Sequence, residues 1–542
     1  MNDLICYIWA RCYCRIFKVC IILIEPMRFG LITFVFLLLL SSGLYAQDQK
    51  KVVEKIVKEA TENSQLEKLA YELTDLIGPR LVGTPQMQHA HDWAVETYKG
   101  WGISAENEQW GEWRGWERGI THIDLIQPRV VTLEGMQLAW SPGTQGGPKE
   151  GELIILPDLK DSLAFQTWLP QVKGKFVMIS MQQPTGRPDY NWEEYATPES
   201  YEKMREVKEK TSKAWNQRIS KTGHDRRSLP LALENAGAVG VLTSNWSGGF
   251  GVNKIFSAYT KKVPTLDISL EDYGMLYRMV EHGDNPKIRV LAESNELGKV
   301  PVFNTIAEIK GTEKPDEYVV LSAHFDSWDG GTGATDNATG TIVMMEAMRI
   351  LKEIYPNPKR TIIAGHWGSE EQGLNGSRAF VEDHPEIVDN IQAVFNQDNG
   401  TGRVVNLSGQ GFLHAYKYLG RWLGAVPDEI RKPIETHFPG MPGSGGSDYA
   451  SFVAVDVPAF SLSSLSWSYG TYTWHTNRDT YDKIVFDDVR SNAILTAILA
   501  YMASEDPETT SREKIDMPVD PSTGTPRPWP SQRPLVREGG LD

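Results

Sequence analysis

Two histidines and several carboxylates stand where apolar segments of this chain end. His324 closes the apolar run EYVVLSAH, and Asp336 follows it in the Gly/Thr-rich loop GGTGATDNATG. Imidazole nitrogens and carboxylate oxygens bind divalent cations, and a carboxylate that bridges two ions suits a centre for hydrolysis. Further residues of these types follow near the ends of later apolar segments: Glu370, Glu371, Asp398 and His475. Together these residues predict a site for two divalent metal ions.

Each of these residues also has a simpler interpretation when it is taken alone. His324 could be a hydrogen-bonded surface residue, His475 an exposed loop residue, and Asp398 part of a turn. A pair such as Glu370 and Glu371 is typical of a solvated helix start. Here, however, the pair follows the buried-strand pattern TIIAGHWGS, where two like charges are costly without a cation. The occurrence of all these segments in one order favours the metal site.

The order and the local sequence of these segments resemble the motifs of the di-zinc exopeptidase family of the aminopeptidase and carboxypeptidase Q (plasma glutamate carboxypeptidase) type. The resemblance rests on HFDSWDGGTGATDN, PKRTIIAGHWGSEEQG and WHTNRDT, and it is strongest in the second half of the chain. It implies that His324 and Asp398 bind one zinc ion. Glu371 and His475 would bind the second ion, with Asp336 as the bridge. The implied cofactor is therefore two zinc ions per chain.

Glu370 and Asp326 are the residues that we expect to assist catalysis. In the family pattern Glu370 adjoins a ligand without being one, so it would take a proton from the water between the ions and pass it to the leaving amine. Asp326 stands two residues after His324. In a strand it would share that face and could accept the other imidazole N–H, although a solvated carboxylate is the alternative. Asp479 either supports His475 or caps the next segment.

The loop GSGGSDYASF resembles the family loop that precedes the last ligand. It places Ser447 and Asp448 where they could line the substrate pocket, and a flexible glycine loop is the alternative. The remaining histidines of this half match no ligand position, and we interpret them as core or surface residues: His366, His384, His414 and His437.

Strands and helices alternate after residue 298, which is typical of an α/β domain. The runs EYVVLSAHF, TIIAGHWG and IQAVFNQD are expected strands, and TIVMMEAMRILKEI has helical spacing of its apolar residues. We expect a three-layer, mostly parallel sheet with the ligands at strand ends. This exopeptidase domain would comprise residues 47–144 and 298–508. A Pro-rich tail at 509–542 is either surface-wrapping or disordered.

The pattern changes between residues 145 and 297. Short apolar strands are expected at GELIILP, GKFVMIS and AVGVLTS, with a charged helical stretch at 191–225. LALENAGAVGVLTSN resembles a protease-associated domain, which the resemblance places as an insertion at this point. The alternative is another α/β layer of the catalytic domain. Besides TIVMMEAMRILKEI, three further helices are expected outside this segment: 51–76, 86–99 and 488–503.

Residues 1–46 have the features of a leader. A basic residue after Met27 precedes an apolar core at Leu31–Leu40 and small residues up to Ala46, so we predict a signal peptide cut between Ala46 and Gln47. An uncleaved anchor is the alternative, although the core is short for spanning a membrane. All four cysteines of the chain lie in this leader: Cys6, Cys12, Cys14 and Cys20. The mature protein, expected to be secreted or periplasmic, would then contain no disulfide.

The charge balance excludes some classes of partner. The formal net charge is −15, and removal of the leader makes it −17, because four basic and two acidic residues leave with it. No basic patch stands out, which argues against nucleic acid and anionic membrane surfaces. The expected partners are peptide substrates, and the resemblance implies a homodimer. No stable membrane anchor is expected in the mature chain.

These observations predict a secreted di-zinc metallo-exopeptidase that hydrolyses dipeptides or short peptides. Two other functions use the same fold. One is a non-catalytic binding protein that has lost its metals, which the full set of ligand types argues against. The other is a glutaminyl cyclase-like acyltransferase, which the insertion at 145–297 argues against. The residues leave open whether a free amino or a free carboxyl end of the peptide is required.

Overall fold

The computed structural model describes residues 47–398 and 400–540. The expected signal peptide, its cleavage site after Ala46 and the four cysteines lie outside the described residues, so they stay predictions. Along the chain, two compact units are divided between Lys58 and Glu59. The described part of the first unit, residues 47–58, is helical. The second unit carries the sheets and the candidate site.

The helix expected over residues 51–76 is interrupted. Helical structure ends at residue 62, and it resumes as α2 (Leu66–Ala70) followed by the π-helical segment η1 (Tyr71–Ile77). The hydroxyl of Ser64 accepts a hydrogen bond from the backbone N–H of Leu66. Such side-chain bonds compete with helical backbone bonds, and they explain the break. The next helix, α3 (Pro85–Gly100), agrees with the expectation and begins at the Thr84 cap.

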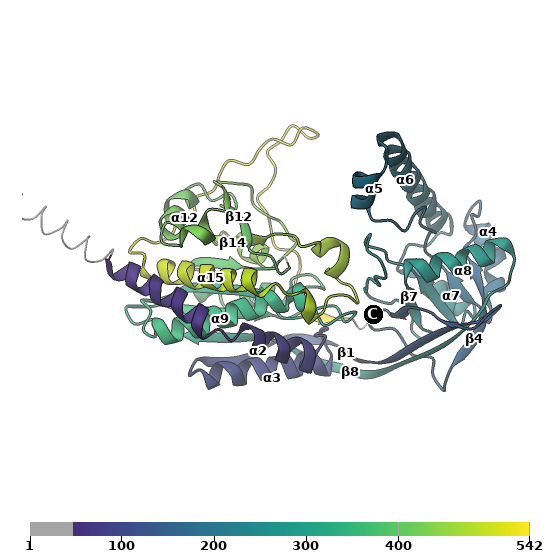
Figure 1. Cartoon of the computed structure of the whole chain (residues 1–542), viewed down its shortest axis with the longest axis horizontal. Helices are drawn as coiled ribbons and strands as arrows, with labels where there is room; N and C mark the ends of the chain where they lie inside the picture. Colours follow the sequence, from purple (N-terminus) through teal and green to yellow (C-terminus); the bar gives the residue numbers. More distant parts are fainter. Residues whose placement is uncertain (1–46, 399, 541–542) are drawn as a thin grey trace, which may run out of the picture. The chain divides into compact units, whose positions relative to one another are not determined.

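A mostly parallel sheet forms the framework of the second unit (Figure 1). The pairs β9–β10, β9–β11 and β11–β14 are parallel, whereas β8 joins β10, and β12 joins β14, in the antiparallel sense. The strands are β8 (Lys287–Ile309), β9 (Lys314–His324), β10 (Arg360–Trp367), β11 (Ile391–Asn396), β12 (Val404–Ser408), β13 (Glu435–His437) and β14 (Ala459–Ser464). Because β9, β10 and β11 are parallel, their carboxyl ends share one edge of the sheet.

Helices cover both faces of this sheet, so the expected three-layer α/β architecture is confirmed. On one face Trp367 of β10 packs against Phe380 and Phe452, at ring distances of 5.1 and 5.9 Å. The adjacent His366 points to the other face, where its Nε2 lies 2.7 Å from the hydroxyl of Tyr98 in α3. The principal helices are α9 (Thr339–Ile354), α10 (Asn375–Asp383), α12 (Ala415–Leu423), α14 (Tyr449–Val453) and α15 (Phe486–Glu505). Within the described residues no helix has both the length and the apolar character needed to cross a membrane.

Two long strands connect the sheet that contains β9, β10 and β11 with the sheet of the inserted segment. β1 (Ser104–Gln127) pairs antiparallel with β8 along nearly its whole length. One end of β8 pairs with β10 and the other end pairs with β4 (Lys149–Ile155). The tryptophans of β1 do not alternate strictly, because bulges interrupt the register at Gln109/Gly111 and Gly115/Trp116. Strand periodicity therefore did not indicate β1 in the sequence.

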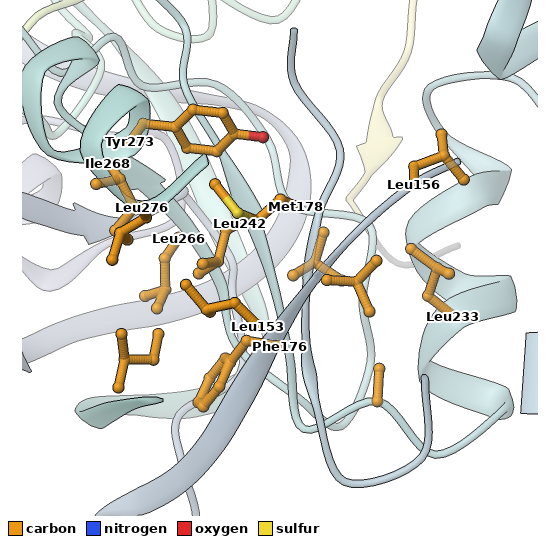
Figure 2. Close-up of a cluster of buried hydrophobic side chains, with 14 of the residues drawn as sticks. Leu153, Leu156, Phe176, Met178, Leu233, Leu242, Leu266, Ile268, Tyr273 and Leu276 are labelled. Carbon is orange, nitrogen blue, oxygen red and sulfur yellow. The ribbon is translucent and has the colours of Figure 1, made fainter. Parts of the chain in front are cut away.

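The inserted segment has its own parallel sheet and apolar core. After β4, the strands β5 (Phe176–Met178), β6 (Gly240–Thr243) and β7 (Thr265–Ile268) pair in parallel, and β3 (Gly135–Gln137) pairs antiparallel with β7. Buried side chains such as Phe176, Leu242 and Leu266 fill the space beneath the helices (Figure 2). Those helices are α4 (Ser162–Trp168), α6 (Pro198–Lys221), α7 (Ser228–Asn235) and α8 (Leu270–His282), whereas α5 (Asp189–Tyr195) buries none of its side chains. Assignment of this segment to a protease-associated domain stays a prediction.

The tail after residue 509 contacts α10, α14 and β1. The indole N–H of Trp529 donates to the carbonyl oxygen of Val453 at 2.9 Å. Further on, Arg537 forms an ion pair with Asp383 at 2.7 Å, and β15 (Glu538–Gly539) pairs in parallel with β1. The surface-wrapping alternative for the tail thus agrees with the described residues.

Candidate active site

His324, the last residue of β9, faces two carboxylates. Its Nε2 lies 3.1 Å from Oδ1 of Asp398 and 3.3 Å from Oδ1 of Asp336. Asp398 follows β11, the parallel neighbour of β9, so the two strand ends bring these residues together. The three side chains are buried, and their ligand atoms all lie within 4.8 Å of one another. This group can hold one metal ion.

Asp336 connects this group with a second one. Its Oδ1 faces His324, and its Oδ2 lies 3.4 Å from Nε2 of His475. The same imidazole nitrogen lies 2.9 Å from Oε2 of Glu371. Asp336, Glu371 and His475 form a second set of ligand atoms within 4.8 Å of one another. The five ligands expected from the sequence therefore meet in space, with Asp336 shared between the two groups.

The chemistry of this cluster fits divalent cations. Among the described residues, Oδ2 of Asp336 and Oε1 of Glu371 are buried without a hydrogen-bond partner. Burial, and the nearby Asp336 carboxylate, raise the pKa of Glu371 well above its usual range. Burial opposes a charge on His324, but the carboxylates around it, Asp398 foremost, raise its pKa. An excess of buried negative charge of this kind is stabilised when cations bind.

Glu370 lies beside the cluster on the turn that carries Glu371. Burial raises the pKa of Glu370 well above its usual range. The positive charge of His324 opposes this shift, whereas the Asp398 and Asp448 carboxylates increase it. A buried carboxyl group beside a set of candidate metal ligands is placed where a general base could act.

Asp326 has a different role from the one expected. The Nδ1 atom of His324 is 2.9 Å from the backbone carbonyl oxygen of Asp326 and 3.6 Å from its carboxylate. The imidazole is therefore oriented by the carbonyl group. The carboxylate instead accepts hydrogen bonds from the backbone N–H groups of Glu370 and Glu371, at 3.0 and 3.2 Å. It positions the turn that bears Glu370 and Glu371.

Asp479 also differs from both expected alternatives. Its carboxylate accepts the backbone N–H groups of Thr335 and Asp336, at 2.7 and 3.0 Å. Asp479 therefore positions the segment that carries Asp336. It neither caps the next segment nor contacts His475 through a hydrogen bond among the described residues. Burial raises the pKa of Asp479 to about 7.

Arg80 is a positioning residue that sequence analysis missed. It is fully buried, and its guanidinium donates to the carbonyl oxygens of Phe325, Thr332 and Gly333 at 2.8 Å each. It therefore holds both ends of the loop between His324 and Asp336. The only signal was its place in IGPRLVGTP, a segment far from the ligands in the chain.

The proposed substrate residues lie at the base of α14. Ser447 accepts a hydrogen bond from the side-chain amide of Asn396, the last residue of β11, at 2.8 Å. Asp448 is fully buried, and neither of its carboxylate oxygens has a hydrogen-bond partner within the described part of the chain. Burial raises its pKa to about 7. Whether these two residues touch substrate stays a prediction.

The inserted segment supports the loop that carries His475. The backbone N–H of Ile255 donates to the carbonyl oxygen of His475 at 2.8 Å, and the ring of Phe256 meets the imidazole edge-on at 5.3 Å. The ammonium group of Lys254 lies 3.9 Å from the ring centre of Trp474. Residues 254–256 thus pack against the loop that carries His475.

The remaining histidines lie outside the cluster, as expected. His366 is buried against Tyr98, and His384 contacts Glu108 at 2.8 Å. His414 pairs with Glu513 at 3.1 Å, while the exposed His437 contacts Asn406.

Comparisons with known proteins agree with this geometry. Residues 304–500 match the profile of peptidase family M28. Carboxypeptidase Q from Bos taurus is 25% identical over 465 residues, covering 85% of this chain and 89% of that protein. The human carboxypeptidase Q is 24% identical over 466 residues, covering 85% and 90%.

Solved structures show the same fold. A peptidase M28 precursor from Shewanella amazonensis has a TM-score of 0.63 at 22% identity, covering 90% of this chain and all of that one. A zinc aminopeptidase from Bacillus subtilis has a TM-score of 0.53 at 16% identity, covering 83% and 97%. The fold, the site and these relatives define a zinc-dependent exopeptidase.

Proposed function

We propose that this protein is a di-zinc exopeptidase that hydrolyses dipeptides or short peptides outside the cytoplasm. The observation that carries the proposal is the sharing of Asp336, whose two oxygens face His324 and His475 from opposite groups. A carboxylate with one oxygen toward each group can bridge two ions about 3.5–4 Å apart. The relatives named carboxypeptidase Q and zinc aminopeptidase support the exopeptidase chemistry.

The five ligands would divide between two sites. His324 and Asp398 would hold one zinc ion, and Glu371 and His475 the other. Imidazole and carboxylate donors suit zinc, and three protein ligands leave a position open for water or substrate. When bound, the two ions would polarise the scissile carbonyl and lower the pKa of a water molecule.

The protein's own groups would handle the proton. The carboxylate of Glu370 takes a proton from the attacking water while the oxygen of that water bonds to the peptide carbonyl carbon. The same carboxyl group then gives that proton to the leaving nitrogen as the carbon–nitrogen bond breaks. Asp326 fixes the turn that carries Glu370 through two backbone hydrogen bonds, at 3.0 and 3.2 Å. The base and the ligand Glu371 are thereby held together.

Chelation tests this proposal. Removal of metal should leave a mostly folded protein without peptidase activity, because both the electrophile and the activated water are lost. Addition of zinc should restore activity at two equivalents per chain, measured by metal analysis beside a dipeptide hydrolysis assay. Full activity in metal-free protein would refute the proposal. Saturation at a single equivalent would refute its di-zinc part.

The proposed location rests on the leader at residues 1–46. Cleavage after Ala46 would release a secreted or periplasmic enzyme that acts on peptides, without nucleic acid or a membrane anchor as partner, and a homodimer is the assembly that the family resemblance supports. N-terminal sequencing of protein recovered from its host should find Gln47 first. An intact Leu31–Leu40 segment in the membrane fraction would instead establish an anchor.

A further inference from the structure

The two candidate histidine ligands are oriented in different ways. The Nδ1 atom of His324 lies 2.9 Å from the carbonyl oxygen of Asp326, and this contact fixes the direction of the imidazole. The Nδ1 atom of His475 is buried, and none of the described residues gives it a hydrogen-bond partner. A histidine that binds a metal is usually oriented by a hydrogen bond at its other ring nitrogen. The orientation of His475 therefore depends on contacts of another kind.

Among the described residues, three aromatic rings lie against the imidazole of His475. The ring of Trp474 is the nearest, with its centre 4.0 Å from that of the imidazole and the two planes tilted by 35°. The ring of Phe256 meets the imidazole edge-on at 5.3 Å, and the ring of Trp328 lies 5.9 Å away. Rings packed at these distances attract one another and limit rotation of the imidazole.

The backbone brings the rings of Trp474 and His475 together. Neighbouring side chains of an extended chain point to opposite sides. His475 instead has a φ of 61°, in the left-handed region, which a residue other than glycine keeps only when its surroundings enforce it. The carbonyl oxygen of His475 accepts the backbone N–H of Ile255 at 2.8 Å. The stacked arrangement thus depends on a turn that the inserted segment helps to hold.

Lys254 of the same segment contacts the indole of Trp474. Its ammonium nitrogen lies 3.9 Å from the centre of the indole ring, within the range of a cation–π contact. Lys254 is only 9% exposed, and none of the described residues forms an ion pair with it. A cation that has lost most of its water gains more from an aromatic face than an exposed cation does. Lys254 therefore restrains the ring that lies against His475.

We propose that Trp474 and Lys254 are positioning residues for the second metal ion, because together they fix the imidazole of His475. The proposal rests on the di-zinc function proposed above and adds how one of the ligands is oriented. Packing against the indole takes the place of the hydrogen bond that orients His324. Neither Trp474 nor Lys254 supplies a metal-binding atom in this arrangement, and both act through His475.

A direct contact between Trp474 and the substrate is the competing explanation, because this side chain is 37% exposed. Loss of an aromatic surface that binds peptide would raise KM and leave zinc affinity unchanged. A positioning role predicts weaker zinc binding at one of the two sites. It also predicts a lower kcat that excess zinc partly restores, with little change in KM.

Zinc titration of the mature chain against a chelator separates these explanations. Glu371→Gln marks the binding step of the second site, because it removes one of the ligands of that site. We expect Trp474→Leu to weaken the same step roughly 10- to 100-fold, as the loss of a group that orients a ligand does. Trp474→Phe retains a flat ring and should keep most of the zinc affinity. Dipeptide hydrolysis by each variant gives kcat and KM.

A second pair of variants tests the contact with the ammonium group. Lys254→Met retains the length of the side chain without its charge and should weaken the same step by roughly 3- to 10-fold. Lys254→Arg should restore the affinity, since a guanidinium also stacks on an indole. Trp467→Ala is the control, because its exposed indole lies in the same loop and bonds to Asp488. It should bind zinc like wild type.

The proposal is overturned if Trp474→Leu binds both zinc ions as tightly as wild type, or if it weakens both steps equally. A rise in KM without any change in zinc affinity establishes the substrate contact instead. If Trp474→Leu does not fold, Lys254→Met decides, and unchanged zinc binding in that variant refutes the proposal. In each of these cases the di-zinc function stands. A wild-type chain that binds a single zinc ion would refute the di-zinc function and this proposal together.

Discussion

At the scale of single residues, the site contains two kinds of side chain. Some offer atoms that can bind a metal ion, and others hold these candidate ligands in position. His324 and Asp336 lie close together because β9 ends at His324 and the loop that follows β9 brings Asp336 back beside it. Asp326 and Asp479 contribute no ligand atom to the two metal groups, yet each accepts two backbone N–H groups from the segments that carry ligands or base. Buried acceptors of this kind stiffen a site whose charges repel one another.

The two adjacent glutamates provide the test at this scale. Glu370→Gln retains the size of the side chain but cannot accept a proton, so we expect turnover to fall by about 10²–10⁴ while zinc content stays near that of wild type. Glu371→Gln should instead weaken one of the two zinc sites, because it removes a charged oxygen ligand. Turnover and zinc stoichiometry are measured for both variants. The assignment is reversed if Glu370→Gln is the variant that loses zinc, and it is wrong if that variant keeps near-normal turnover.

The residues that could be predicted from sequence are those with a local signature. Candidate ligands such as His324, which ends β9, and Asp398, which follows β11, stand in short motifs, so their types and positions indicate a metal centre. The positioning roles lacked such a signature. Arg80 acts on carbonyl groups about 245 residues away in the chain, and Asp479 acts on Asp336 from 143 residues away. Those contacts depend on the tertiary fold alone.

At the scale of elements, the loop that carries His475 is supported by a segment from the insertion. Residues 254–256 contact residues 474–476 through a backbone hydrogen bond, a ring contact and the isolated bridge Lys254–Thr476. The position of His475 therefore depends on packing from a segment outside the sheet around which the other candidate ligands gather. The sequence pattern predicted most of these strands, but it missed β1 because bulges break its alternation. The break near Ser64 was also missed, since a local side-chain bond outweighed the helical spacing.

Removal of the Phe256 ring tests this support. Phe256→Ala deletes the edge-on contact with His475 at 5.3 Å, so the imidazole gains freedom and the zinc ion that it binds should be held roughly 10-fold less tightly. The second ion should be unaffected. Zinc affinity is measured by competition with a chelator, with Tyr259→Ala, a change at an exposed aromatic residue of the same segment, as the control. If Phe256→Ala binds zinc as tightly as the control Tyr259→Ala, the insertion does not support the site.

At the scale of the whole molecule, the last described residues of the chain pack on elements that surround the active site. Tail residue Val536 donates its backbone N–H to the side chain of Asn375 at 3.3 Å, and the amide of Asn375 donates to the hydroxyl of Ser369 at 3.1 Å. Ser369 directly precedes Glu370. The tail thus connects β1, α10 and the turn of the base, so local stability of this turn depends on the C-terminus of the chain.

Truncation of the tail tests this dependence. A chain that ends at Pro528 loses the Trp529 indole bond to Val453, the Arg537–Asp383 ion pair and the pairing of β15 with β1. We expect the free energy of unfolding to fall by roughly 2–4 kcal/mol, since several partly buried hydrogen bonds contribute about 1 kcal/mol each. Hydrogen exchange should increase at residues 369–375, and kcat should fall, because the turn that bears the base becomes less ordered. A chain that lacks only residues 541–542 is the control and should behave like wild type. If the truncated enzyme unfolds at the same temperature and shows the same exchange at this turn, the tail only covers the surface and does not stabilise the catalytic turn.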